Sequence, residues 1–190
     1  MMFSSKQVIV VYPEVYEELA IALQHEISKV DGFDSAAWTL ELYRQNMPTL
    51  SGRSNVIFIG DPDENRYSKM YLSQISNIVN INGACFGSDG SKAVVFGEGK
   101  LEQKRDFEAY KNDVGYGLAA SGAIGAAVSG AFLVAVPFIP LGGALGFIGY
   151  KVFKFFKSKS EVKELRYEQT KLAIYNFVLT ELDTWVGKEG

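Results

Sequence analysis

The chain has 190 residues with 22 acidic and 19 basic side chains, which give a formal net charge of −3. Because no excess of basic residues is present to hold a phosphate backbone, we expect no nucleic-acid partner. The single cysteine, Cys85, excludes an internal disulfide and a multi-cysteine metal site. With only one histidine, His25, we expect no metal and no cofactor.

The N-terminal part of the chain predicts strands that alternate with helices. Residues 7–12 and 55–60 are short, continuous apolar runs rich in β-branched residues, as in strands that are covered on both faces. Residues 14–30 favour a helix after the first run. After the second run, residues 61–65 are followed by a segment that favours a helix through Ser76. Residues 36–43 alternate apolar and polar side chains and predict a third strand, although a short helix would accept the same residues.

Residues 83–97 complete this region as a β-hairpin around the turn Ser88-Asp89-Gly90, after a loop over residues 46–54 between the second and third strands. Two strand–helix units in succession imply parallel strands. We therefore expect an α/β fold with a small Rossmann-like or flavodoxin-like, mostly parallel sheet. This sheet should have about four or five strands and an antiparallel edge. We assign residues 1–100 to this head domain.

The most unusual part of the sequence is an uncharged run, residues 114–150, built almost wholly from Gly, Ala, Val, Ile, Leu and Phe. A membrane-spanning helix needs about 20 mainly apolar residues, and this run is nearly twice as long. Pro137 and Pro140 interrupt it, and proline disfavours helix in the residue before it. We therefore predict a transmembrane helical hairpin that turns within residues 137–143.

Small residues recur at every fourth position of this run, which places them on shared faces of a helix. Such faces let two helix backbones approach closely in a bilayer, where lipid supplies no hydrophobic drive for association. The expected membrane and oligomer interface consists of Gly117, Ser121, Gly122, Gly125, Ser129, Gly130, Pro137, Pro140, Gly142 and Gly146. The expected partners are thus a lipid bilayer and further copies of the chain.

Two other interpretations of the run stay open. A helical hairpin that is apolar all round can also be the buried core of a soluble α+β protein. The size of the chain opposes this, because a domain of this length buries only about 70% of its unfolded surface. A hairpin that is hidden in a soluble form and inserted later would combine both, and in that general logic the run resembles the hydrophobic hairpin of pore-forming colicins.

The segments on either side of the run predict helices. Residues 100–113 carry charges of both signs and favour a stalk helix that continues into the run. Residues 151–159 alternate lysines with apolar, mainly aromatic side chains, which is typical of a helix that leaves a bilayer with its lysines near the headgroups. Residues 160–186 predict an amphipathic helix that packs on the head or on a neighbouring copy. We assign residues 101–159 to the stalk and hairpin and 160–190 to the C-terminal helix.

Candidate ligand-binding residues follow the first and third strands, because open parallel sheets bind ligands beyond the carboxyl ends of their strands. They are Pro13, Glu14, Asp61, Asp63 and Asn65, with Arg53 as a clamp for a phosphate or carboxylate. The acidic residues among them are also ordinary turn and helix-capping residues, which explains them without a ligand. The sequence supplies no nucleophile with an orienting base and no glycine motif for nucleotide phosphates.

These observations favour a non-enzymatic protein of the cytoplasmic membrane, with both termini in the cytosol because basic residues flank the run on both sides. The head would bind a small-molecule or protein ligand, and the hairpin would insert, oligomerise and permeabilise or reshape the membrane. The alternative is a membrane-anchored or cytoplasmic α/β enzyme that acts on a nucleotide-like ligand, with the hairpin as its anchor or buried core.

Overall fold

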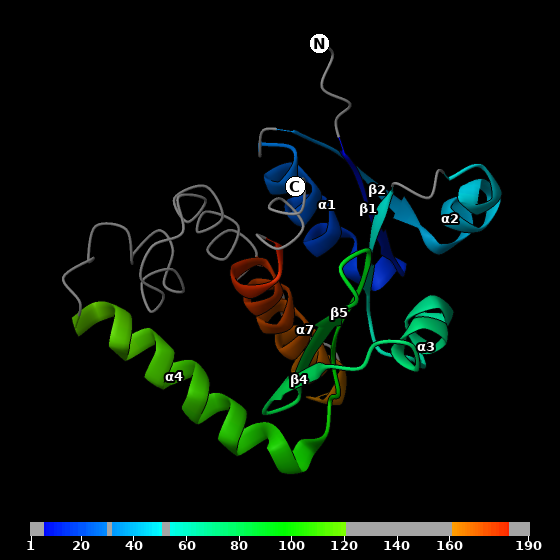
Figure 1. Ribbon diagram of the computed structural model, residues 1–190. Helices are drawn as coiled ribbons and strands as arrows, with labels where there is room; N and C mark the ends of the chain where they lie inside the picture. Colours follow the sequence, from blue (N-terminus) through cyan, green and yellow to red (C-terminus); the bar gives the residue numbers. More distant parts are fainter. Residues whose placement is uncertain (1–5, 30–31, 51–53, 121–160, 183–190) are drawn as a thin grey trace.

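The computed structural model describes residues 6–29, 32–50, 54–120 and 161–182. They form a mixed α/β fold in three layers, with a central six-stranded, mostly parallel sheet and helices on both of its faces (Figure 1). Most of the uncharged run, and with it the predicted hairpin turn, lies outside the described residues.

The sheet is built from β1 (Lys6–Tyr12), β2 (Phe33–Thr39), β3 (Asn55–Ile59), β4 (Ile78–Ile81), β5 (Ala84–Ser88) and β6 (Lys92–Gly97). Its strand order is β2-β1-β3-β6-β5-β4, in which β2, β1, β3 and β6 are parallel neighbours. β5 and β4 add an antiparallel edge. Every residue of β3 is buried, and so are the last five residues of β1, which confirms both apolar runs as covered strands.

The helices are α1 (Glu17–Ile27), α2 (Leu40–Asn46), α3 (Arg66–Leu72), α4 (Lys104–Ala120) and α7 (Glu161–Thr180), with short 3-10 helices η1 (Glu14–Tyr16), η2 (Met47–Thr49) and η3 (Leu101–Gln103). One hydrophobic core joins α1 and α7 to Val8 and Val10, and a second joins α2 and α3 to Ile9 and Val11. Because successive side chains of a strand point to opposite faces, β1 supplies both cores.

The prediction of one strand over residues 36–43 is wrong in its second half. β2 ends at Thr39, and α2 begins at Leu40. The Thr39 hydroxyl oxygen accepts the Leu42 N–H at 3.2 Å and so caps the helix. Alternating side chains gave no sign of this boundary, and the end of α2 and η2 occupy the first part of the predicted loop over residues 46–54.

The edge strand β4 is absent from the sequence prediction. The helix predicted after residues 61–65 is α3, but it ends at Leu72 and not at Ser76. Asn82 and Gly83 join β4 to β5 with φ angles of 49° and 88°. An Asn-Gly pair between two strands is a strong hairpin signal, so this turn was predictable from the sequence. The hairpin predicted over residues 83–97 is the β5–β6 pair, and the antiparallel pairing confirms it.

α7 packs on the sheet of its own chain. Of the two packing partners predicted for the C-terminal amphipathic helix, the structure therefore shows the head. An ideal Cβ at Gly97 in β6 would lie 2.2 Å from the Arg166 carbonyl oxygen, so the helix backbone needs a glycine there. Leu165 and Leu172 are buried in the α1 and α7 core, as their seven-residue spacing predicts. Residues 183–190, at the end of the predicted helix, lie outside the described part.

α4 runs without interruption from its charged residues into the beginning of the uncharged run and ends at Ala120. A stalk helix was the prediction for residues 100–113, and η3 takes the place of its first turn. Figure 1 shows α4 extending away from the sheet. Among the described residues, no helix is long and apolar enough to cross a bilayer. The hairpin and the division into three parts stay predictions.

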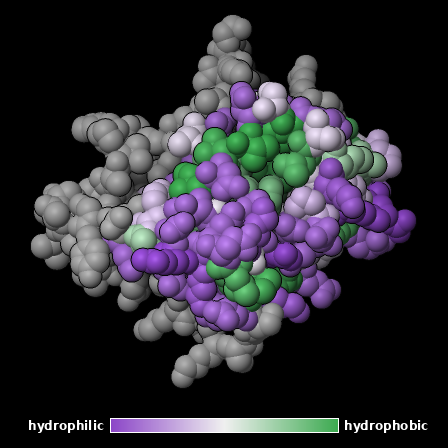
Figure 2. Space-filling view, turned by 90° about the horizontal axis from the view of Figure 1, so that it is seen from below, coloured by the Kyte–Doolittle hydropathy of each residue, from purple (hydrophilic) through white to green (hydrophobic). Residues whose placement is uncertain are grey.

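The described surface is largely hydrophilic on the face that Figure 2 shows, with separate hydrophobic patches. The exposed large apolar side chains are Val15, Ile21, Leu42, Met47, Met70, Val79, Leu101 and Val162. They belong to different helices and strands on both sides of the sheet. Single exposed apolar residues are normal in folded proteins, so they do not define one interface.

Candidate functional site

The carboxyl ends of β1 and β3 are the first place to look for a ligand site, because the chain runs outward from β1 to β2 and then returns to β3 on the other side. Gly60 follows β3 with a φ of 108°. An ideal Cβ on it would lie 3.1 Å from Tyr16 Cε2 and 3.2 Å from Pro13 Cγ. The Tyr16 ring and Pro13, which follow β1, therefore pack against Gly60 at the end of β3.

Tyr16 belongs to a polar network that joins three parts of the chain. Its hydroxyl donates a hydrogen bond to Glu64 Oε2 at 2.8 Å, and Arg166 Nη1 donates to Glu64 Oε1 at 3.1 Å. The Tyr16 ring also stacks on Tyr167, with ring centroids 5.8 Å apart. Because burial strongly raises the pKa of Tyr16, its hydroxyl stays protonated and remains a donor. The network ties α7 to the ends of β1 and β3.

The predicted ligand residues lie at this edge but do not converge on one point. Asp61 Oδ1 accepts the Asp63 N–H at 2.9 Å, and burial raises the pKa of the Asp61 carboxyl group. Asn65 is buried and caps α3, because its side-chain oxygen accepts the N–H groups of the second and third residues after it. Pro13 packs near Gly60, and Glu14 and Asp63 are exposed. Arg53 lies outside the described residues, so ligand binding by this set stays a prediction.

Sequence reasoning missed the polar residues of α7 that meet the sheet. Gln169 and Thr170 are fully buried. Gln169 Oε1 accepts the Gly99 N–H and Thr170 Oγ1 accepts the Gly97 N–H, both at 2.8 Å. With Arg166 they stand at positions i, i+3 and i+4 of the helix, which put them on one face. That polar row between Leu165 and Leu172 was the available sign that the helix docks by hydrogen bonds as well as apolar contact.

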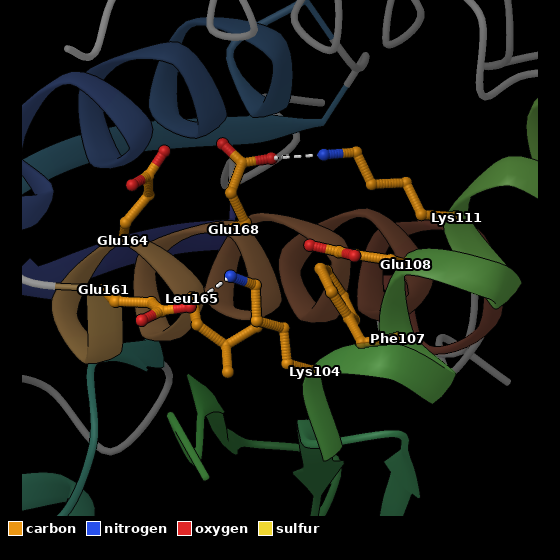
Figure 3. Close-up of a pocket in the computed structure, with 8 residues that line it drawn as sticks. All are labelled: Lys104, Phe107, Glu108, Lys111, Glu161, Glu164, Leu165 and Glu168. Carbon is orange, nitrogen blue, oxygen red and sulfur yellow. Dashed lines mark hydrogen bonds and ion pairs between the residues drawn. The ribbon is translucent and has the colours of Figure 1, made fainter. Parts of the chain in front are cut away.

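A groove of about 150 Å³ lies between α4 and α7 (Figure 3). It is lined by Lys104, Phe107, Glu108, Lys111, Glu161, Glu164, Leu165 and Glu168. Lys104 pairs with Glu161, and Lys111 Nζ lies 3.2 Å from Glu168 Oε2. Each member of the second pair stands seven residues after its counterpart in the first, so the two helices run in the same direction. Phe107 and Leu165 are the buried apolar residues between them.

Two lysines, Lys111 and Lys171, lie close to Glu168 at one end of this groove. Glu168 also lies 3.6 Å from Lys171, so one carboxylate serves two ammonium groups. Burial lowers the pKa of Lys171 to about 8, and the Glu168 carboxylate opposes that shift. This cluster holds α4 against α7 next to the buried core.

The residues assigned to the membrane and oligomer interface fall almost wholly outside the described part. Gly117 lies in α4, in the last turns of that helix. The other nine, Ser121, Gly122, Gly125, Ser129, Gly130, Pro137, Pro140, Gly142 and Gly146, lie within residues 121–160.

The described residues show no ready catalytic chemistry. Burial raises the pKa of the Cys85 thiol to about 12, so it stays protonated and packs as a small apolar group. No cluster of three His, Cys, Asp or Glu side chains suited to a metal occurs among the described residues. No known protein family, no curated protein and no solved structure matches the chain.

Proposed function

We propose that this protein is a membrane-associated effector, in which an α/β head carries a glycine-rich hairpin that inserts into a bilayer and oligomerises there. The observation that supports it most directly is α4, one uninterrupted helix that leaves the head through charged residues and reaches into the uncharged run. A helix of this kind is a rigid stalk between an aqueous domain and a bilayer. The cytosolic head binds a ligand or protein partner that controls the hairpin.

The position of α7 is consistent with this arrangement. The chain returns from the uncharged run into α7, which is fixed on the sheet next to α4. Both ends of the run are thereby held by the same head, as a two-pass hairpin requires. Lysines occur on both flanks of the run, which favours a cytosolic location for both termini.

The rows of small residues supply the reason for oligomerisation. Gly117, Ser121, Gly125 and Ser129 make a row longer than one contact between two hairpin arms needs. In a bilayer, close packing along such rows is a main route to helix association. Part of the row therefore faces another copy of the chain, and the assembled hairpins permeabilise or reshape the membrane.

The test combines membrane flotation, crosslinking and leakage of a dye from vesicles. The full-length protein should float with membranes and need detergent for extraction. Gly125→Leu should abolish both higher oligomers and leakage, because a bulky side chain in the row separates the helices. Ala123→Leu is the matched control, since Ala123 lies about 200° around the helix from Gly125 and the variant places the same leucine side chain outside the row.

Three results would contradict the proposal. One is a monodisperse protein that needs no detergent and never binds vesicles. Another is an oligomer that persists in Gly125→Leu. The third is a wild-type protein that neither oligomerises nor causes leakage at any concentration.

A second function is supported by the strand order. The parallel order β2-β1-β3 is that of flavodoxin-like sheets, in which ligands bind where the order reverses. A nucleotide-like ligand bound by an enzyme of this type would have to displace the Tyr16 ring from the space beside Gly60. Nucleotides that raise the melting temperature of the wild type, but not of Gly60→Val, would favour this enzyme over the effector.

A further inference from the structure

The groove between α4 and α7 has more negative than positive charge. Its lining includes four glutamates and two lysines, and the lysines are paired with Glu161 and Glu168 (Figure 3). Glu108 and Glu164 make no ion pair with any other described residue and are exposed. Between these carboxylates lie the apolar side chains of Phe107 and Leu165. Such a groove suits a segment that presents lysines beside large apolar side chains.

The chain itself supplies such a segment directly before α7. Residues 151–159 contain four lysines, Lys151, Lys154, Lys157 and Lys159, between Val152, Phe153, Phe155 and Phe156. An extended chain spans at most about 3.3–3.6 Å per residue, so Lys157 lies within about 14 Å of Glu161 and Lys154 within about 25 Å. The groove from Glu161 to Glu168 is about 10 Å long, since a helix rises about 1.5 Å per residue.

The direction of the two helices also brings the segment to the groove. α4 ends at Ala120, about 24 Å along its axis from Lys104, while α7 begins at Glu161 beside Lys104. The chain between them must therefore travel back by the length of α4, and its last part approaches the groove at Glu161.

We infer that the groove is the docking surface of residues 151–159 of the same chain, with Glu108 and Glu164 pairing with their lysines and Phe107 and Leu165 contacting their aromatic rings. A tether this short gives the segment an effective concentration near the groove in the millimolar range. The lysines then neutralise the groove instead of reaching lipid headgroups. This inference does not depend on insertion of the uncharged run, because it uses only α4, α7 and the chain directly before α7.

Zero-length carbodiimide crosslinking of the full-length protein tests the contact, because it joins only carboxylates and amines that touch. The known pairs, Lys104 with Glu161 and Lys111 with Glu168, provide the internal control. The inference predicts an additional link from Glu108 to Lys154 or Lys157, within one chain when labelled and unlabelled protein are mixed. Links to Lys104 and Lys111 alone would overturn it, and so would links from Glu108 only to a second copy.

Charge reversal gives the second measurement. Glu108→Lys with Glu164→Lys should speed chymotrypsin cleavage at residues 153–156 about three- to tenfold, as expected for loss of one or two exposed ion pairs. Lys154→Glu with Lys157→Glu in the same chain should restore protection. Glu17→Lys with Glu102→Lys, two exposed glutamates outside the groove, is the matched control and should leave the rate unchanged.

The bilayer is the competing partner, so both measurements are repeated in phosphatidylcholine vesicles with and without phosphatidylglycerol. Crosslinks that persist in both support the groove as the docking surface. Crosslinks that disappear when the anionic lipid is added would assign the lysines to headgroups and overturn the inference. A cleavage rate that is the same in the wild type and in the Glu108→Lys, Glu164→Lys variant would overturn the inference as well. So would an equal increase of the rate in the control variant.

Discussion

α4 and α7 flank the uncharged run, yet they are attached to the head in different ways. α7 contributes six apolar residues to the core, Leu165, Leu172, Ala173, Ile174, Phe177 and Val178, and two fully buried polar residues, Gln169 and Thr170. Leu182, just after the helix, is buried in the same core. Among residues 104–112 of α4, whose side chains the structure describes, Phe107 is buried in the core and Tyr110 is half-buried beside it. The other described links of α4 are ion pairs to α7 and the hydrogen bond from Asn82 Nδ2 to the Asp106 carbonyl oxygen.

This difference gives the two helices different roles: α7 is needed for folding, and α4 is attached more loosely. The head cannot close its core without α7, although α7 comes after the uncharged run in the sequence. The described side chains of α4, in residues 104–112, make few apolar contacts, so we expect this part of the helix to change its angle at little cost to the sheet. In the proposed effector, a movement of the predicted hairpin would therefore be transmitted more easily through α4, while α7 anchors the returning chain.

The largest expected effect is loss of a core side chain from α7. Phe177 is fully buried, so Phe177→Ala should lower the free energy of unfolding by about 3–5 kcal/mol in denaturant titrations. Phe107→Ala should cost less and should raise hydrogen exchange mainly in α4, because the sheet closes without that helix. Equal losses of stability in the two variants would contradict the comparison.

A buried hydrogen bond of α7 should have the next largest effect. Thr170→Val keeps the shape but leaves the Gly97 N–H without its acceptor, which should cost about 1–3 kcal/mol of stability. Thr180→Val is the control, because the Thr180 hydroxyl is exposed and donates only to the Asn176 carbonyl oxygen. If both variants unfold at the same denaturant concentration, the polar row does not anchor α7.

Lys171 should make stability depend on pH. Burial holds its pKa at about 8, below that of the unfolded chain, so between about pH 8 and 10 the unfolded state binds more protons. Stability should therefore rise between about pH 8 and 9, by about 1 kcal/mol per unit at most, and Lys171→Met should remove the rise. Above that range the buried tyrosines oppose it, because burial raises the pKa of their hydroxyl groups above that in the unfolded chain. Both titrations belong in a Cys85→Ala background, because the raised pKa of the Cys85 thiol lowers stability as the unfolded thiol ionises. If stability still rises with pH in Lys171→Met, the rise does not come from Lys171.

The smallest expected effect concerns the groove pair on the side of α4. Lys111→Gln should destabilise the contact between α4 and α7 by about 0.2–1 kcal/mol at low salt. The effect should become smaller in 1 M salt without vanishing, because salt screens a partly buried ion pair less than an exposed one. Hydrogen exchange of the first turns of α4 measures this loss of stability. Lys69→Gln is the control, because Lys69 is an exposed residue of α3. An effect that salt does not change would mean that Lys111 acts by packing.

The strands that are covered on both faces were predictable because their composition is extreme. Residues 8–12 and 56–59 are apolar throughout and form most of β1 and β3, whereas β4 is short and half-exposed at the sheet edge and has no such pattern. The boundary between β2 and α2 was also ambiguous in the sequence, because a single hydrogen bond to the Thr39 hydroxyl oxygen sets it. Local pattern predicts elements whose environment is uniform, and it fails where a single contact sets the boundary.

The sequence alone determined the α/β class, the central strands, the amphipathic C-terminal helix and the uncharged run, because each depends on the kind of residue at successive positions. Only the tertiary structure decided that Tyr16 packs against Gly60, that Arg166, Gln169 and Thr170 fasten α7 to the sheet, and that α4 and α7 share an acidic groove. These contacts join residues up to 102 positions apart. Hydrogen bonds and ion pairs depend on distances of a few ångströms, and only the folded chain sets such distances between remote residues.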